Sequence, residues 1–190
     1  MSSRDDQIIL IGYRASGKTT VGRKLAERLG RPFMDADEYL EAQAGRTIRE
    51  IFATEGEPGF RDRESAVLRE LTGRGPMVLA TGGGVVLREE NRDRIRAAGF
   101  VAWLTADADT LWDRLQTDPV TRERRPNLAG GGLEEVTKML TVREPLYRAL
   151  ANLEINVAEL SPDVAADRIL AAWNARRTAV FSTISTGEGM

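Results

Sequence analysis

The sequence contains no cysteine and no histidine among its 190 residues. Without cysteine, the chain has no thiol nucleophile, no disulfide and no zinc ribbon. Without histidine, it cannot build a Ser-His-Asp triad, so proton transfer near neutral pH must use Asp, Glu, Lys or a metal-bound water. The two absences therefore exclude thiol catalysis and the histidine-based hydrolases.

Excess charge, aromatic residues and long apolar runs are also scarce. The 27 basic and 29 acidic residues give a net charge of −2, and aromatic residues make up 6% of the chain. A nucleic-acid partner calls for a basic surface or stacked aromatic side chains. No run approaches the roughly 18 apolar residues of a membrane span, and Asp5 and Asp6 rather than basic residues precede the first run. We expect a cytoplasmic monomer with neither nucleic-acid nor membrane partners.

Five short apolar runs rich in β-branched residues predict buried strands at residues 7–12, 32–35, 77–81, 100–105 and 153–157. Helical patterns separate these runs, as where Val21, Leu25 and Leu29 recur every four residues before Gly30. This alternation predicts a three-layer α/β/α fold in which helices cover both faces of a five-stranded parallel sheet. We expect one domain over residues 1–181 and a loose tail over 182–190.

Residues 117–133 interrupt this rhythm. The segment contains Arg122, Arg124, Arg125 and a run of three glycines, with almost no apolar residue to anchor it. Loops of this length in compact domains are usually functional or disordered, and an inert surface loop has little need for clustered arginines. We interpret the segment as functional, and an inert surface insertion is the alternative.

Residues 12–19 fit the pattern G-x-x-x-x-G-K-[ST], directly after a predicted strand and directly before a predicted helix. In such a P-loop, backbone N–H groups and the helix N-terminus face the phosphates. Lys18 is expected to reach the β- and γ-phosphates, and the Thr19 hydroxyl to bind Mg²⁺. The loop predicts ATP and Mg²⁺ as ligands, but it does not identify the phosphate acceptor.

Two carboxylates follow the second predicted strand. Asp35 and Asp37 are two residues apart, so extended backbone would direct both toward one cleft at the ligand-binding edge of the sheet. One could hold the metal while the other accepts a proton from a substrate hydroxyl. An N-cap pair for a helix starting near Glu38 is the alternative.

Arginines and glycines supply further candidates for the acceptor site. Residues 56–61 are predicted to form a turn that ends in Arg61, whose planar fork suits a carboxylate, with Glu64 one helical turn later; a surface salt bridge is the alternative. Glycines 82–84 end the third strand and would expose N–H groups. Pro145 is expected to interrupt a helix and to set the angle at which Arg143 enters the cleft.

Together these motifs resemble the shikimate kinase family of P-loop kinases. The resemblance runs from about residue 8 to about residue 175, with the motifs in the same order along the chain. They are residues 12–20, 35–37, 56–61 with Glu64, 80–84, 125–126 and 143–147. The resemblance implies a P-loop kinase fold with a lid at about residues 117–133. It also implies ATP-dependent phosphorylation of the 3-hydroxyl of shikimate, a step of chorismate and aromatic amino acid biosynthesis.

The resemblance also implies site residues, with an acceptor-binding region at about 36–64. The residues implied on the nucleotide side are Gly12, Ala15, Ser16, Gly17, Lys18, Thr19, Thr20, Arg114 and Arg125. Those implied to bind shikimate are Asp37, Arg61, Gly83 and Arg143, with Glu64 bracing the arginines. Asp37, as base or orienter, would act with Lys18 and the lid residue Arg125 in catalysis, and Thr19 and Asp35 would hold Mg²⁺.

The sequence departs from the family pattern in three places. Ala15 stands where the family often has glycine, residues 158–162 lack the arginine that some members place beside adenine, and the lid is longer than in compact members. Two alternative functions stay open at this stage. One is a kinase of gluconate or another small hydroxy or sugar acid, and the other is a non-catalytic P-loop module that binds a nucleotide.

Overall fold

The computed structural model describes residues 7–117 and 132–185, with side chains up to residue 179. Its centre is a five-stranded sheet in the order β2-β3-β1-β4-β5, and every strand pair is parallel. The strands are β1 (Gln7–Ile11), β2 (Phe33–Asp35), β3 (Val78–Ala80), β4 (Gly99–Thr105) and β5 (Leu153–Asn156). All five predicted strands and the α/β class are confirmed.

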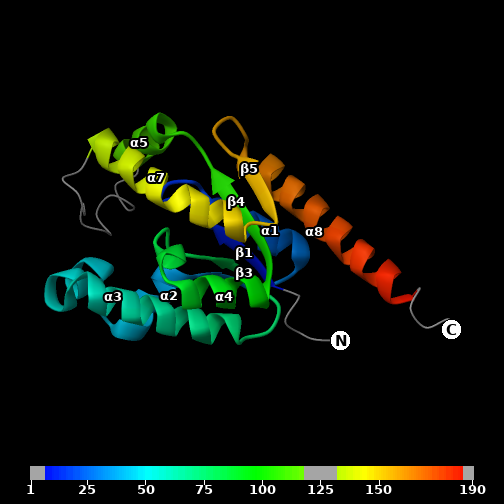
Figure 1. Cartoon of the computed structure of the whole chain (residues 1–190), viewed down its shortest axis with the longest axis horizontal. Coiled ribbons are helices and arrows are strands. Elements are labelled where there is room, and N and C mark those ends of the chain that lie inside the picture. The colour runs from blue at the N-terminus through cyan, green and yellow to red at the C-terminus, as the bar shows by residue number, and fades with distance from the viewer. Residues whose placement is uncertain (1–6, 118–131, 186–190) are drawn as a thin grey trace.

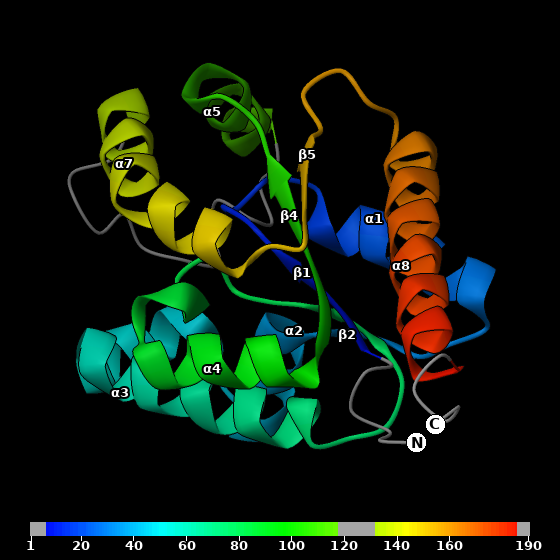
Figure 2. The same cartoon turned by 45° about the vertical axis from the view of Figure 1, so that its right-hand side comes forward.

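Helices cover both faces of the sheet (Figures 1 and 2). They are α1 (Lys18–Leu29), α2 (Ala36–Ala44), α3 (Ile48–Thr72), the 3₁₀ helix η1 (Val85–Leu87), α4 (Glu89–Ala98), α5 (Ala108–Thr117), α7 (Gly132–Leu150) and α8 (Pro162–Ser185). Ile8 and Leu10 of β1 pack with α1 and α8, whereas Ile9 and Ile11 pack with α2, α3, α4 and α7. Both faces of β1 are apolar because both are buried.

A third apolar cluster lies beyond the sheet edge, over the predicted P-loop. Tyr13 packs there with Leu111 and Leu115 of α5 and with Val136 and Leu140 of α7. Figures 1 and 2 show α5 and α7 side by side. The two helices that flank residues 118–131 are therefore anchored against the loop.

Three predictions about the helices need correction. Within residues 56–61 only Gly56 leaves the helical conformation, with φ 69° and ψ −175°, so the predicted turn is reduced to a kink between the two parts of α3. Pro145 lies inside α7 and does not interrupt it. Finally, α8 continues to Ser185, so residues 182–185 are helical rather than a loose tail. No glycine or proline follows Pro162 until Gly187, so nothing stops the helix earlier; residues 186–190 lie outside the described part.

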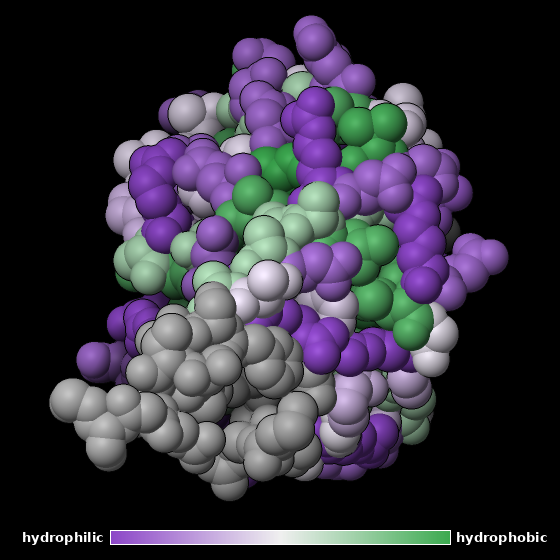
Figure 3. All heavy atoms as spheres, turned by 90° about the vertical axis from the view of Figure 1, so that its right-hand side faces the viewer, coloured by the Kyte–Doolittle hydropathy of each residue, from purple (hydrophilic) through white to green (hydrophobic). Residues whose placement is uncertain are grey.

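The exposed surface offers no large apolar face in the described part of the chain. Hydrophilic and apolar side chains are interspersed in the view from the side on which α8 ends (Figure 3). The large apolar residues that are exposed are Leu87, Leu133, Val142 and Val164. Among the described helices, none is long and apolar enough to cross a membrane.

Candidate active site

The loop between β1 and α1 curls around the Lys18 ammonium group. Lys18 Nζ donates to the carbonyl oxygens of Gly12, at 2.9 Å, and Tyr13, at 2.7 Å, and to Ser16 Oγ. Gly12 has a φ of 143°, and a Cβ there would collide with the Leu104 carbonyl oxygen, so only glycine fits. Gly17 precedes α1 without a side-chain cap, which leaves the first-turn N–H groups facing the loop. This arrangement suits a polyphosphate.

Ala15 is the one described non-glycine residue with a positive φ, at 61°. An L-residue pays roughly 1–2 kcal/mol for this left-handed conformation. The departure from the family's glycine is therefore accommodated as local backbone strain in the P-loop.

We expect Ala15→Gly to raise the free energy of unfolding by about 1 kcal/mol, because glycine adopts the left-handed conformation without a Cβ clash. Thermal denaturation followed by circular dichroism should show a melting temperature roughly 2–4 °C higher. Gly45→Ala is the matched control, since Gly45 has a φ of 62° and open space around it. That variant should be destabilised by a similar amount, and an unchanged Ala15→Gly variant would contradict the assigned strain.

Asp35 joins the P-loop to α2. Its Oδ2 accepts a 2.7 Å hydrogen bond from the Thr19 hydroxyl, while its Oδ1 accepts from the backbone N–H groups of Asp37 and Glu38. Asp35 is thus both the N-cap of α2 and a neighbour of Thr19. The extended-backbone argument for the acid pair is wrong, because Asp37 lies in the first turn of α2; Asp37 still lies at the same edge of the sheet, half-buried.

The Thr19 and Asp35 oxygens fit a Mg²⁺ ion. Both are hard oxygen donors, and their hydrogen bond shows that they can share one small ion. No three acidic side chains of the described part gather into a metal cage. An ion here would therefore complete its shell with phosphate oxygens and water, as Mg²⁺ does in phosphoryl-transfer enzymes.

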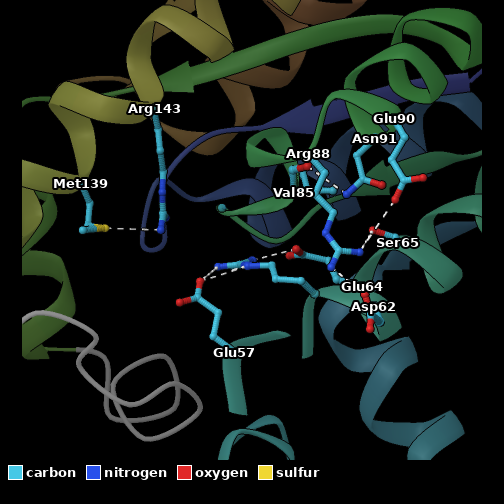
Figure 4. A network of polar contacts seen from close by, with 12 residues as sticks. Glu57, Asp62, Glu64, Ser65, Val85, Arg88, Glu90, Asn91, Met139 and Arg143 are labelled. Atoms are coloured by element: carbon cyan, nitrogen blue, oxygen red, sulfur yellow. Dashed lines mark hydrogen bonds and ion pairs between the residues drawn. The ribbon is translucent and has the colours of Figure 1, made fainter. Parts of the chain in front are cut away.

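Arg61 is held on α3 by two glutamates. Its Nη1 donates to Glu64 Oε2 at 2.7 Å, and its Nε and Nη2 donate to Glu57 Oε1 at 3.2 and 3.0 Å. Figure 4 shows this network of polar contacts, with Glu57 and Glu64 labelled. Arg61 and Glu64 are only 6% and 4% exposed, so the surface salt bridge considered from the sequence is excluded.

A second group of charges supports the kink of α3. Glu55 accepts hydrogen bonds from Arg63 and Arg46, and these bonds lower the pKa of its carboxyl group below the usual value. Gly59 makes room, because a Cβ there would approach the Glu55 Cβ. A lowered pKa in the folded state stabilises the fold at neutral pH, and this contribution is lost as the carboxyl is protonated on acidification.

The glycine triplet lies between Arg61 and the P-loop. A Cβ on Gly83 would be 3.3 Å from the Gly12 carbonyl oxygen, and one on Gly84 would lie within 2.6 Å of the Arg61 Cζ. The Tyr147 hydroxyl, fully buried, donates to the Gly83 carbonyl. The backbone of the triplet therefore fixes the distance between the phosphate-binding loop and the arginine.

We expect Gly84→Ala to raise the KM for the acceptor roughly tenfold or more with a smaller effect on kcat, because its methyl group would displace the Arg61 guanidinium. The backbone is not the obstacle, since Gly84 has ordinary dihedral angles, φ −95° and ψ −2°. Gly75→Ala serves as the control, because a Cβ there meets nothing within 4 Å. Equal KM values for the two variants in steady-state assays would refute the prediction.

Arg143 enters the site from α7. Its side chain is 7% exposed, its Nη2 lies 3.5 Å from Met139 Sδ, and its Cζ lies 5.7 Å from the centre of the Tyr13 ring. Within residues 7–117 and 132–179, Nε has no hydrogen-bond partner, and no carboxylate pairs with the guanidinium. Figure 4 shows the side chain pointing from α7 toward the region of Glu57 and Glu64. A buried cation without a neutralising acid is a site prepared for an anion.

The other residues predicted to bind the nucleotide do not all lie in the P-loop. Arg114 Nη2 donates to the carbonyl oxygens of Val157 and Ala158, at 2.8 and 3.0 Å, and so holds the loop after β5. Thr20 is exposed on α1. Arg125 lies outside the described residues.

Sequence reasoning missed three side chains of this site. Glu57 precedes Arg61 by four residues, and helical i,i+4 spacing could have found it. Tyr147 follows Arg143 by four residues and so shares its helix face, although its bond to Gly83 spans 64 residues. Glu135 of α7 accepts from Arg14 of the P-loop at 3.4 Å, a contact between residues too far apart in sequence to predict.

A phosphate-binding loop at the edge of a parallel sheet, with a carboxylate–hydroxyl pair and two buried arginines beside it, defines a P-loop kinase of small molecules. Comparison with known proteins narrows this class. A model of the shikimate kinase family matches residues 14–174. The chain belongs to the shikimate kinase family, and the expected enzyme class is confirmed.

Individual relatives agree with this assignment. The shikimate kinase of Symbiobacterium thermophilum is 49% identical over 78% of this chain and 84% of its own length, and that of Rhodopirellula baltica is 43% identical over 89% and 91%. The structure of the Acinetobacter baumannii shikimate kinase in complex with shikimate matches with a TM-score of 0.84 and 38% identity, covering 92% of this chain and 96% of that one. A Sinorhizobium meliloti gluconokinase, at 16% identity and a TM-score of 0.63, shares the fold alone.

Proposed function

We propose that the enzyme transfers the γ-phosphoryl group of ATP to the 3-hydroxyl of shikimate, a step of aromatic amino acid biosynthesis. The observation that carries the proposal is Arg143. This residue is only 7% exposed, has no acidic partner in the described part of the chain, and lies beside the Tyr13 ring of the P-loop. Burial of an uncompensated cation is costly, so the site is stabilised by an anionic ligand. The carboxylate of shikimate supplies that charge.

On the nucleotide side, the chain positions the phosphates and supplies positive charge. The N–H groups of residues 12–17 and of the first turn of α1 bind the phosphate oxygens, and Lys18 exchanges its carbonyl partners for the β- and γ-phosphates. Thr19 and Asp35 would hold Mg²⁺, which when bound neutralises charge on the β- and γ-phosphates. Arg114 keeps the loop after β5 in place near the nucleotide, and Arg125 would close over the phosphates.

On the acceptor side, Arg61 and Arg143 bind the shikimate carboxylate. Glu64 holds the Arg61 guanidinium at 2.7 Å, so the fork is oriented before the substrate arrives. The Gly83 N–H contacts the substrate. With the carboxylate fixed, the hydroxyl groups at the other end of the ring face the P-loop and Asp37.

Asp37 orients the 3-hydroxyl and accepts its proton as the oxygen attacks phosphorus. The chain has no histidine for this step, so a carboxylate is the expected proton acceptor. Asp35 is assigned to the metal beside Thr19, whose hydroxyl it binds at 2.7 Å. Asp37 is half-buried in the first turn of α2, at the same edge of the sheet as the P-loop, and its carboxylate acts as the base.

A coupled assay of ADP release tests the proposal. Shikimate should stimulate ADP release strongly, whereas gluconate and AMP at equal concentration should not. Release stimulated by gluconate instead would favour the kinase of another sugar acid. ATP binding by calorimetry without any acceptor-dependent release would favour the non-catalytic module. Size-exclusion chromatography tests the predicted monomer.

A further inference from the structure

One edge of the Arg61 guanidinium is already occupied in the empty site. Nε and Nη2 lie on one side of the fork, and both donate to a single oxygen, Glu57 Oε1, at 3.2 and 3.0 Å. This is one of the two edges through which an arginine binds a carboxylate with two parallel hydrogen bonds. The contact with Glu64 uses Nη1 instead.

The two glutamates differ in how readily they can leave Arg61. The Glu64 side chain is 4% exposed, so breaking its pair would strand a charge in the interior. The Glu57 side chain is 47% exposed, and water can solvate its carboxylate when it turns away. Glu57 also directly follows the kink at Gly56, at the start of the second part of α3. Glu57 is therefore the exchangeable partner, and Glu64 the permanent one.

We infer that Glu57 is an internal competitor for the carboxylate of the substrate: it holds the Nε/Nη2 edge of Arg61 in the empty site and is displaced when shikimate binds. The inference rests on the proposed role of Arg61. An intramolecular carboxylate competes at high effective concentration, so an anion that engages Arg61 alone gains little by replacing it. A ligand whose carboxylate contacts Arg61 and Arg143 together gains enough binding free energy to displace Glu57. Glu57 thus lowers affinity for every anion but rejects the simple ones most, which makes it a determinant of specificity.

Glu57→Gln tests this inference, because it keeps the shape of the side chain and removes the competing charge. The KM for shikimate should fall by roughly two- to fivefold, the range expected from losing a half-exposed ion pair. The kcat and the KM for ATP should not change. Inorganic phosphate should also become a stronger competitive inhibitor against shikimate. Glu57→Ala, checked for folding by circular dichroism, should also lower the KM for shikimate and the inhibition constant of inorganic phosphate.

Asp62→Asn is the matched control. Asp62 adjoins Arg61 on α3 and carries the same charge, but its side chain is 73% exposed and pairs with Arg88. Its KM for shikimate should match that of the parent chain. An unchanged or raised KM in both Glu57 variants would overturn the inference, because Glu57 would then brace Arg61 as Glu64 does. An equal fall in the KM for shikimate in Asp62→Asn would also overturn the inference, because the fall would then reflect the loss of any negative charge near Arg61. A parent chain without shikimate-dependent ADP release would instead refute the proposed function.

Discussion

Replacing Asp37 by asparagine is expected to lower kcat by about 10²- to 10⁴-fold, the usual contribution of a positioned general base. Asparagine keeps the size and most of the hydrogen bonding of the side chain but cannot accept the hydroxyl proton. The KM values for shikimate and ATP should change little, because the carboxylate clamp and the P-loop are untouched. Steady-state kinetics of ADP release, with both substrates varied, measure the two effects separately.

Glu38→Gln provides the control for Asp37→Asn. Both residues are acidic and lie in the first turn of α2, so both variants lose the same favourable interaction with the helix N-terminus. Glu38 is exposed and pairs with Arg23 of α1 at 3.5 Å. Its variant should retain the parent turnover. Full turnover in Asp37→Asn would show that the catalytic role assigned to Asp37 is wrong, whichever substrate the enzyme uses.

The sheet and the P-loop could be predicted because their signals are local. Strands buried on both faces must be almost continuously apolar, so the sequence marks each of them without knowledge of its neighbours. The P-loop likewise depends on a short spacing of glycine, lysine and threonine between a strand and a helix. The same reasoning found Arg61 and Glu64, which are three residues apart on one helix.

Predictions failed where tertiary packing overrode local preference. Gly56, Pro58 and Gly59 have strong turn preferences, yet only Gly56 leaves the helical conformation, and Pro58 and Gly59 lie in the second part of α3. Phe60 and Arg61, both buried, fix the helix after the kink, and Pro58 falls near the start of this second part, where a missing N–H group costs little. At Asp37 the helix begins two residues earlier than expected, because the Asp35 carboxylate caps it. These two differences reshape the acceptor region without moving its charged residues out of the site.

The site also depends on contacts between residues far apart in the sequence, which the spacing of residues along the chain cannot predict. The Tyr147 hydroxyl supports the glycine triplet, and Arg14 connects the P-loop to Glu135 of α7 across 121 residues. Both contacts come from helix α7, which also carries Arg143. Helix α7 therefore contacts both the P-loop and the glycine triplet, so its position affects the binding of both substrates.

Replacing Arg143 by methionine is expected to raise the KM for shikimate by about 100-fold, the effect of removing one partner of a buried charge-assisted contact. The stability of the free protein should not fall. Methionine fills a similar volume beside Met139 and Tyr13, and no described carboxylate loses a partner. Thermal denaturation should give a melting temperature at or above that of the parent, and the rise that shikimate causes in the parent should disappear.

Arg61→Met should differ from Arg143→Met in its effect on stability, although both arginines are proposed to bind the same carboxylate. Its KM for shikimate should also rise, but the Glu64 carboxylate, 4% exposed, would lose its 2.7 Å partner. Breaking a buried ion pair costs about 3 kcal/mol, or roughly 6–12 °C in melting temperature for a chain of this size. If Arg143→Met were destabilised as strongly as Arg61→Met, the Arg143 guanidinium would already be compensated within the protein. It would then not be the prepared anion site on which the proposed function depends.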